Sequence, residues 1–205
     1  DAEIIALSVQ NTPNVRAVRR SYSRRLKGSD PEFMLMLARE LIRRYDHRWV
    51  AYELLHDHPA AFQCLGQGEL EELGRGINSW SSVDAFARTL SGPAWRDGQM
   101  PDAVIHDWAG CDDRWWRRAA LVSTVALNVR SHGGSGDAPR TLAVCRLLVD
   151  DHTDTVVKAL SWALRALVVH DPQAVRAFLA EYQDQLAARV KREVNNKLDT
   201  GLKNP

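Results

Sequence analysis

Apolar residues recur every three to four positions along almost the whole chain of 205 residues, and the alternating pattern of β-strands is nearly absent. This period places apolar side chains on one face of a helix, so the sequence predicts an all-α protein. Proline just after a capping residue marks several helix starts, because the first turn does not use its missing N–H. We expect such starts at Thr12 with Pro13, Asp30 with Pro31 and Asp171 with Pro172, and an acidic cap at residues 112–113.

The helices are of medium length and short turns separate most of them. Residues 92–101 and 131–139 are the only loop-like stretches of note. A recurring pattern of helix, short turn and helix is what stacked helix pairs require, but a compact bundle fits the pattern equally well. No hinge-like linker interrupts the chain, so we predict a single domain over residues 1–205. The chain begins at Asp1 rather than Met, consistent with a missing natural N-terminus.

The net charge of +1 gives no argument for a nucleic-acid partner, although 22 of the 27 basic residues are Arg. Arginine binds phosphate through its planar fork of donors, but a GC-rich genome explains the total equally well. Cys64, Cys111 and Cys145 are odd in number and far apart, which indicates a reducing compartment and no metal site. Without a signal peptide or an apolar run of membrane length, we expect a soluble protein of the bacterial cytosol or nucleoid.

The stretch INSWSSVDAFA, residues 77–87, holds Trp80 four positions before Asp84, where a helix is expected to begin. Ser81 and Asp84 match a capping box, in which the serine caps the helix and the acid bonds back to the serine's N–H. Trp80 would then be a staple residue, but its partner would be Ala85, which is small for an indole. From the residues alone, the capping interpretation is favoured about two to one over a ligand-facing carboxylate.

The stretch CDDRWWRRAALV places Arg114, Arg117 and Arg118 near a helix N-terminus. Cations there add to the positive end of the helix dipole, so their placement suggests a bound anion. The alternative is that Asp112 and Asp113 offset them. The neighbouring Trp115 and Trp116 are expected in the core.

In VVKALSWALRALVV, a mostly apolar helix carries one polar stripe, formed by Lys158, Ser161 and Arg165, with Trp162 beside it. Such a stripe either faces a cleft or lies on an ordinary surface where the cationic stems cover the indole, and neither interpretation is favoured. The chain has no HExxH, no GxSxG and no glycine-rich phosphate loop, and its seven His residues show no metal-ligand spacing.

In combination, these stretches resemble the AlkD-type family of DNA alkylation-repair glycosylases, which are built from HEAT-like helical repeats. The chain has WSSVD for the family's Trp-x-x-x-Asp, WWRRAAL for W-L-x-R-A-A, and KALSWALR for K-A-I-G-W-x-L-R. TPNVR near the start and REVNNKL near the end extend the likeness from about residue 10 to residue 199. Ser81 replaces a second acid that many members carry, and Asn11 replaces a Gln.

The resemblance implies a curved α-solenoid of helix pairs with a concave, basic face that binds DNA. It assigns the catalytic carboxylate to Asp84, a sugar-contacting indole to Trp80, a second cleft tryptophan to Trp162, and a site-lining, phosphate-binding guanidinium to Arg118. Further candidates for DNA binding are Asn11, Arg114, Arg117, Lys158 and Arg165.

With the resemblance included, the balance on Asp84 reverses towards a carboxylate that faces the sugar. We expect a monofunctional DNA glycosylase that removes cationic alkylated purines, such as N3-methyladenine, N7-methylguanine or bulkier adducts, from duplex DNA without obligatory base flipping. We expect no cofactor, no metal, no membrane partner and a monomer. The alternative is a HEAT-like module that binds nucleic acid or protein without catalysis, in which Asp84 only caps its helix.

Overall fold

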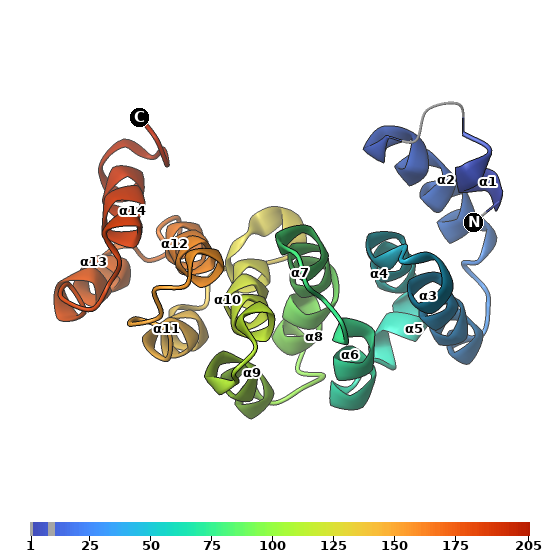
Figure 1. The fold of residues 1–205 in the computed structure, drawn as a ribbon, viewed down its shortest axis with the longest axis horizontal. Coiled ribbons are helices and arrows are strands. Elements are labelled where there is room, and N and C mark those ends of the chain that lie inside the picture. Colours follow the sequence, from blue (N-terminus) through green and yellow to red (C-terminus); the bar gives the residue numbers. More distant parts are fainter. Residues whose placement is uncertain (1, 8–10) are drawn as a thin grey trace. The chain divides into compact units, whose positions relative to one another are not determined.

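A computed structural model describes residues 2–7 and 11–205, and all regular elements within them are helical (Figure 1). The all-α prediction is therefore confirmed. None of the helices in this described part combines the length and apolar character that a membrane span needs. The chain divides into two compact units, Asp1–Arg75 (unit 1) and Gly76–Pro205 (unit 2), and each is described by itself. A single domain and a concave basic face stay predictions.

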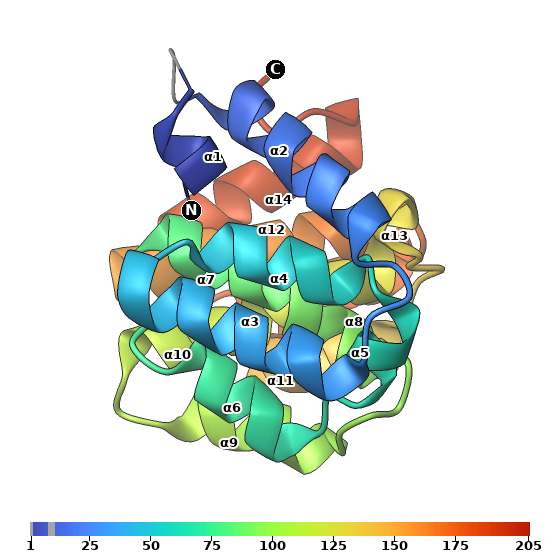
Figure 2. The same ribbon diagram turned by 90° about the vertical axis from the view of Figure 1, so that its right-hand side faces the viewer.

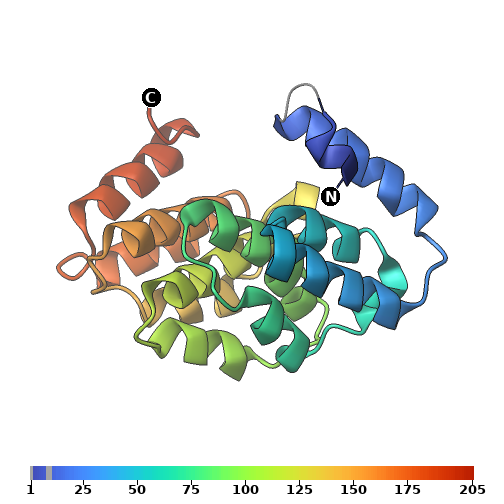
Figure 3. The same cartoon turned by 45° about the vertical axis from the view of Figure 1, so that its right-hand side comes forward.

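Unit 1 is built around two helices that run side by side in opposite directions, α3 and α4 (Figures 2 and 3). Met34, Tyr52 and Leu55 are fully buried, and the Tyr52 hydroxyl donates to the carbonyl of Leu73 at 3.0 Å. The helices of unit 1 are α1 (Ala2–Ile5), α2 (Thr12–Arg25), α3 (Pro31–Tyr45), α4 (Arg48–His56), α5 (Pro59–Gln63) and α6 (Gln67–Gly74).

Unit 2 has a row of successive neighbours, in which α7 packs on α10, α10 on α12 and α12 on α14 (Figure 1). Helices α9, α11 and α13 pack against this row as a second layer. Helix α10 is buried on nearly all sides because it contacts both layers. The elements of unit 2 are α7 (Trp80–Phe86), the π-helical turn η1 (Ala87–Ser91), α8 (Gly92–Arg96), α9 (Asp102–Gly110), α10 (Arg114–Asn128), the 3₁₀ turn η2 (Arg130–His132), α11 (Ala138–Arg146), α12 (Asp154–Leu167), α13 (Pro172–Glu181) and α14 (Ala188–Thr200).

Most of the expected helix starts are confirmed. Asp30, Asp113 and Asp171 are the N-caps of α3, α10 and α13, and each carboxylate accepts a backbone N–H of its own first turn. The expected cap at Thr12 is wrong by one residue, because Asn11 caps α2 and its Oδ1 accepts the N–H of Asn14 at 3.0 Å.

The expectation of a loop over residues 92–101 is wrong for its first half, because Gly92–Arg96 form α8, which continues directly from η1. Gly92 lies so close to α10 that an added Cβ would be 2.7 Å from the Cβ of Ala126 and from the carbonyl oxygen of Ser123. Trp95 buries its ring completely and its indole N–H donates to Asp102 at 2.7 Å. Tertiary packing thus stabilises a helix that Gly and Pro alone would not favour. Residues 131–139 are mostly irregular, as expected.

Candidate functional site

Helix α7 begins two residues earlier than the capping box expected at Ser81 and Asp84. Ser79 is the N-cap, and its hydroxyl accepts the N–H of Ser82, whose own hydroxyl accepts the N–H of Ser79. The capping interpretation of Asp84 is therefore wrong: the box uses two serines, and the carboxylate lies beyond the first turn.

Asp84 forms an ion pair with Arg118 of α10, with two parallel hydrogen bonds. Arg118 Nε donates to Oδ1 and Nη2 donates to Oδ2, each at 2.9 Å. The side chains are 17% and 7% exposed, respectively, so both are largely buried and Asp84 is the more exposed of the two. Arg118 Nη1 donates to the carbonyl of Thr155 in α12 at 2.6 Å. One guanidinium therefore connects three neighbouring helices.

All three nitrogens of the Arg118 guanidinium are engaged in these contacts. Two parallel N–H···O bonds fix both the position and the plane of a carboxylate. In this arrangement Arg118 orients Asp84, and three of its five N–H donors are already used. The phosphate-binding role expected for Arg118 stays a prediction.

Trp80, the first residue of α7, is 67% exposed. Burial of an indole is strongly favourable, so an exposed Trp80 leaves a large apolar surface available for contact with a partner. Trp80 lies four residues before Asp84, so the two side chains project from the same face of α7. An apolar, flat surface thus lies on the same helix face as a partly exposed aspartate.

Trp162 of α12 is half-buried, and the guanidinium carbon of Arg88 lies 5.4 Å from its ring centroid. Arg88 belongs to η1, four residues after Asp84, so the rod formed by α7 and η1 contacts both Arg118 and Trp162. The sequence analysis did not single out Arg88. Its spacing from Asp84 was the available signal, because residues four apart share a helix face.

The other cations of the WWRR stretch have different surroundings. Arg117 Nε donates to Asp151 at 2.7 Å, and Nη1 donates to the carbonyls of Cys111 and Asp112. Burial raises the pKa of Asp151, but hydrogen bonds from Thr153 and Arg117 outweigh it, so the pKa is lowered. Arg117 therefore fastens the start of α10 to the α11–α12 turn.

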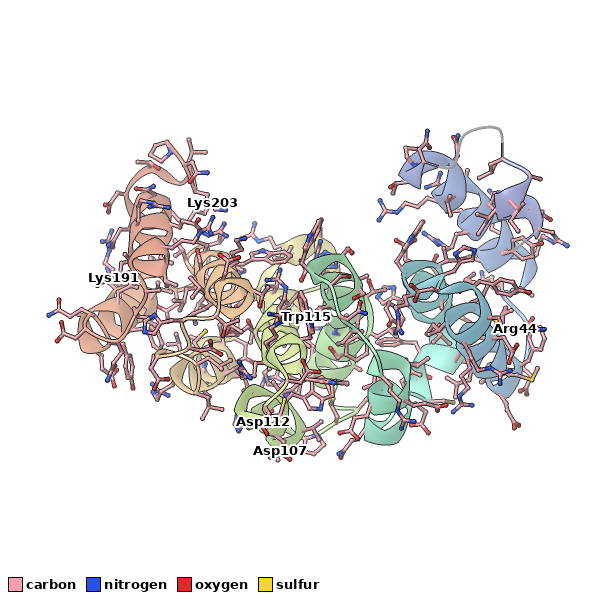
Figure 4. The ribbon with its side chains drawn as sticks, in the orientation of Figure 1. Arg44, Asp107, Asp112, Trp115, Lys191 and Lys203 are labelled. Atoms are coloured by element: carbon pink, nitrogen blue, oxygen red, sulfur yellow. The ribbon has the colours of Figure 1, made fainter. Side chains whose placement is uncertain are left out.

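Arg114 is exposed at the start of α10, and its guanidinium lies 5.1 Å from the ring centroid of Trp115, which is half-buried and labelled in Figure 4. Trp116 is half-buried and packs against Trp108 and Phe86. Neither of the two tryptophans expected in the core is fully buried: Trp116 joins an aromatic cluster, and Trp115 lies under Arg114.

The polar stripe of α12 faces α14. Ser161 is buried and donates to the buried Glu193 at 2.6 Å. Arg165 donates to Ser161 at 3.2 Å and lies 3.8 Å from Glu193. Lys158 is exposed and pairs with Asp154 at 2.7 Å, a hydrogen bond that lowers the pKa of Asp154. Ser161 and Arg165 thus hold two helices together, and Lys158 is the exposed residue of the stripe.

Asn11 belongs to unit 1, where its side chain caps α2, so it is described apart from the residues above. Among the described residues, no group of three or more His, Cys, Asp or Glu side chains is placed to hold a metal ion. Direct contacts thus join Asp84 with Arg118, and Arg88 with Trp162, all within unit 2.

Comparison with known proteins gives one match. A search of curated proteins and a search of solved structures each found nothing similar. The family model described as DNA alkylation repair enzyme matches residues 7–198, which is nearly the whole chain and includes Asp84, Arg118 and Trp162. On this match, the chain belongs to the family of DNA alkylation repair enzymes.

Proposed function

We propose that this chain is a monofunctional DNA glycosylase that hydrolyses the N-glycosidic bond of cationic alkylated purines in duplex DNA. Family membership supports a role in repair of alkylated DNA. The observation that carries the proposal is the Asp84 carboxylate, which Arg118 holds in a fixed plane and whose side chain stays partly exposed on the same helix face as the exposed Trp80.

The chemistry requires little more than a fixed negative charge. A purine methylated at N3 or N7 carries a positive charge and leaves as a neutral base without protonation. Departure of the base develops oxocarbenium character on the deoxyribose. A preorganised carboxylate stabilises that charge, because its position needs no reorganisation during the reaction. Asp84 stabilises the sugar cation and orients the water that attacks it.

Arg118 acts through Asp84. Its paired hydrogen bonds hold the carboxylate in one plane and prevent its rotation. Holding a catalytic group in one geometry removes an entropic part of the barrier. Trp80 and Trp162 offer flat aromatic faces, which stabilise nearby positive charge and exclude water from the sugar.

The decisive experiment measures single-turnover release of the base from a duplex with one N7-methylguanine. We expect release by the wild type and a loss of at least about tenfold, about 1.4 kcal/mol in the barrier, for Asp84→Asn. The matched control is Asp151→Asn, which breaks the pair with Arg117, the residue next to Arg118, at similar burial. The control should release the base at the wild-type rate.

The second candidate is a module that binds DNA without catalysis. One observation favours it: both oxygens of Asp84 already accept hydrogen bonds from Arg118, as in a purely structural ion pair. On that alternative, wild type and Asp84→Asn bind the duplex equally well and neither releases the base. Equal loss of release in Asp84→Asn and Asp151→Asn would indicate general damage to the fold and would remove Asp84 from the mechanism.

A further inference from the structure

Arg88 has an environment unlike that of the arginines around it. Arg117 and Arg118 each pair with an aspartate, whereas no carboxylate among the described residues pairs with Arg88. Its guanidinium lies over the ring of Trp162, and Nη2 contacts Nε2 of His132. Both of these partners are uncharged when the imidazole nitrogen accepts a hydrogen bond.

The Nε of Arg88 is buried and has no hydrogen-bond partner. A buried donor that lost its water without gaining a partner costs about 1–3 kcal/mol, and more when the group is charged. The side chain as a whole is half-buried and not fully enclosed. A cation in this position is therefore short of an anionic acceptor.

The surroundings hold Arg88 in place. It lies in the π-helical turn η1, and such turns occur often at functional sites because they redirect a helix locally. His132 ends η2, and its carbonyl accepts a hydrogen bond from Arg96 of α8. The ring of Trp162 restricts the guanidinium from the other direction. A preorganised arginine loses little entropy when an anion binds.

We propose that Arg88 binds a backbone phosphate of the DNA strand that carries the damaged base. Arg88 lies four residues from Asp84 on the same rod, about one helical turn, so an anion at Arg88 is a close neighbour of a group held at Asp84. A deoxyribose at Asp84 is flanked by phosphates on both sides. Arg118 contacts Asp84 directly, but each of its three guanidinium nitrogens already donates a hydrogen bond within the protein. This assignment rests on the proposed function for the identity of the strand.

The first test measures binding of an unmodified duplex over a range of salt concentrations, so it requires no base release. We expect Arg88→Gln to weaken binding about tenfold at low salt, as for one charge-assisted contact. The slope of log affinity against log salt should fall by about 0.9, the value for one phosphate. Arg88→Lys should keep the wild-type slope. Arg146→Gln removes an equal charge from an exposed position on α11 and should leave the slope unchanged.

The second test replaces single phosphates around an N7-methylguanine with neutral methylphosphonates. The wild type should lose affinity at one flanking position, and Arg88→Gln should be insensitive to replacement at that same position. An unchanged salt slope in Arg88→Gln, or equal sensitivity of both proteins at every position, overturns the proposal and leaves Arg88 as a support for Trp162. If Arg88→Gln lowers the salt slope as expected but the wild type releases no base, the phosphate contact stands and only the glycosylase proposal is contradicted.

Discussion

Two adjacent arginines on α10, Arg117 and Arg118, form ion pairs with different parts of the chain. Arg117 pairs with Asp151, 34 residues later, and Arg118 pairs with Asp84, 34 residues earlier. Successive residues of a helix project about 100° apart, so neighbours contact different partners. The pair of Arg117 and Asp151 connects α10 to the turn before α12. The pair of Arg118 and Asp84 holds a carboxylate on the same helix face as the exposed Trp80. The same residue type therefore has a structural and a site-forming role within two positions.

At the residue scale we predict strong coupling between Asp84 and Arg118. Arg118→Gln leaves a carboxylate without its partner in a site that is mostly buried, so the free energy of unfolding should fall by about 3 kcal/mol. Asp84→Asn combined with Arg118→Gln should cost less than the sum of the single changes, by about 1 kcal/mol or more. Urea denaturation of the four proteins measures this difference. Strict additivity would show that the pair contributes no interaction energy.

At the scale of elements, Glu193 joins α12 to α14 and to the C-terminal segment. Its carboxylate accepts from Ser161 and Arg189 and lies 3.4 Å from the amino group of Lys203, which Figure 4 labels beside α14. Burial acts to raise the pKa of Glu193, but these hydrogen bonds and the cations Lys203 and Arg165 outweigh it and lower the pKa. Ionised Glu193 therefore stabilises the folded state.

Because the pKa of Glu193 is lowered in the folded state, the direction in which its contribution to folding stability changes with pH is fixed. The stabilisation is complete above the ordinary pKa of a glutamate and is lost as the pH falls through the pKa of the folded state. At pH 7, Glu193→Gln should lower the free energy of unfolding by about 2 kcal/mol. The difference from wild type should shrink below roughly pH 4.5. Urea denaturation at several pH values tests this, with Glu181→Gln, an exposed carboxylate of α13, as the control. A difference that is constant with pH contradicts the assignment.

The contact of α8 with α10 gives a second element-scale prediction. At Gly92, a Cβ would meet the side chain of Ala126 and two backbone oxygens at 2.7 Å, so Gly92→Ala forces the helices apart. We expect a loss of about 1–3 kcal/mol in the free energy of unfolding. Gly110→Ala in α9 is the matched control, because nothing lies within 4 Å of its Cβ position. Denaturant unfolding should show the control to be neutral or slightly stabilising.

Helix starts were predictable because their causes are local. At Asp30, Asp113 and Asp171 the capping carboxylate and the N–H that it satisfies lie within three residues of each other. At α7, Ser79 and Ser82 form the capping box in place of the predicted pair of Ser81 and Asp84. The sequence alone does not show which hydroxyl accepts which N–H. The pair of Asp84 with Arg118 depends on the packing of α7 against α10, which no local pattern specifies.

At the scale of the whole molecule, charge is nearly balanced everywhere. Unit 2 carries 16 Lys and Arg against 15 Asp and Glu, close to the net charge of +1 for the chain. Many of its arginines are paired with carboxylates, as Arg117, Arg118 and Arg189 are. Affinity for a polyanion is therefore expected to come from the cations without such partners, and not from a large net positive charge.

DNA binding is therefore expected to depend on local contacts that release counterions. Each phosphate that the protein neutralises adds about 0.9 to the slope of log affinity against log salt. We predict a slope of about 2 or more for duplex DNA, measured by fluorescence anisotropy between low and physiological salt. Phosphate contacts carry no sequence information, so a methylated and an unmethylated duplex should give the same slope. A slope near zero would exclude phosphate binding and, with it, duplex DNA as the substrate.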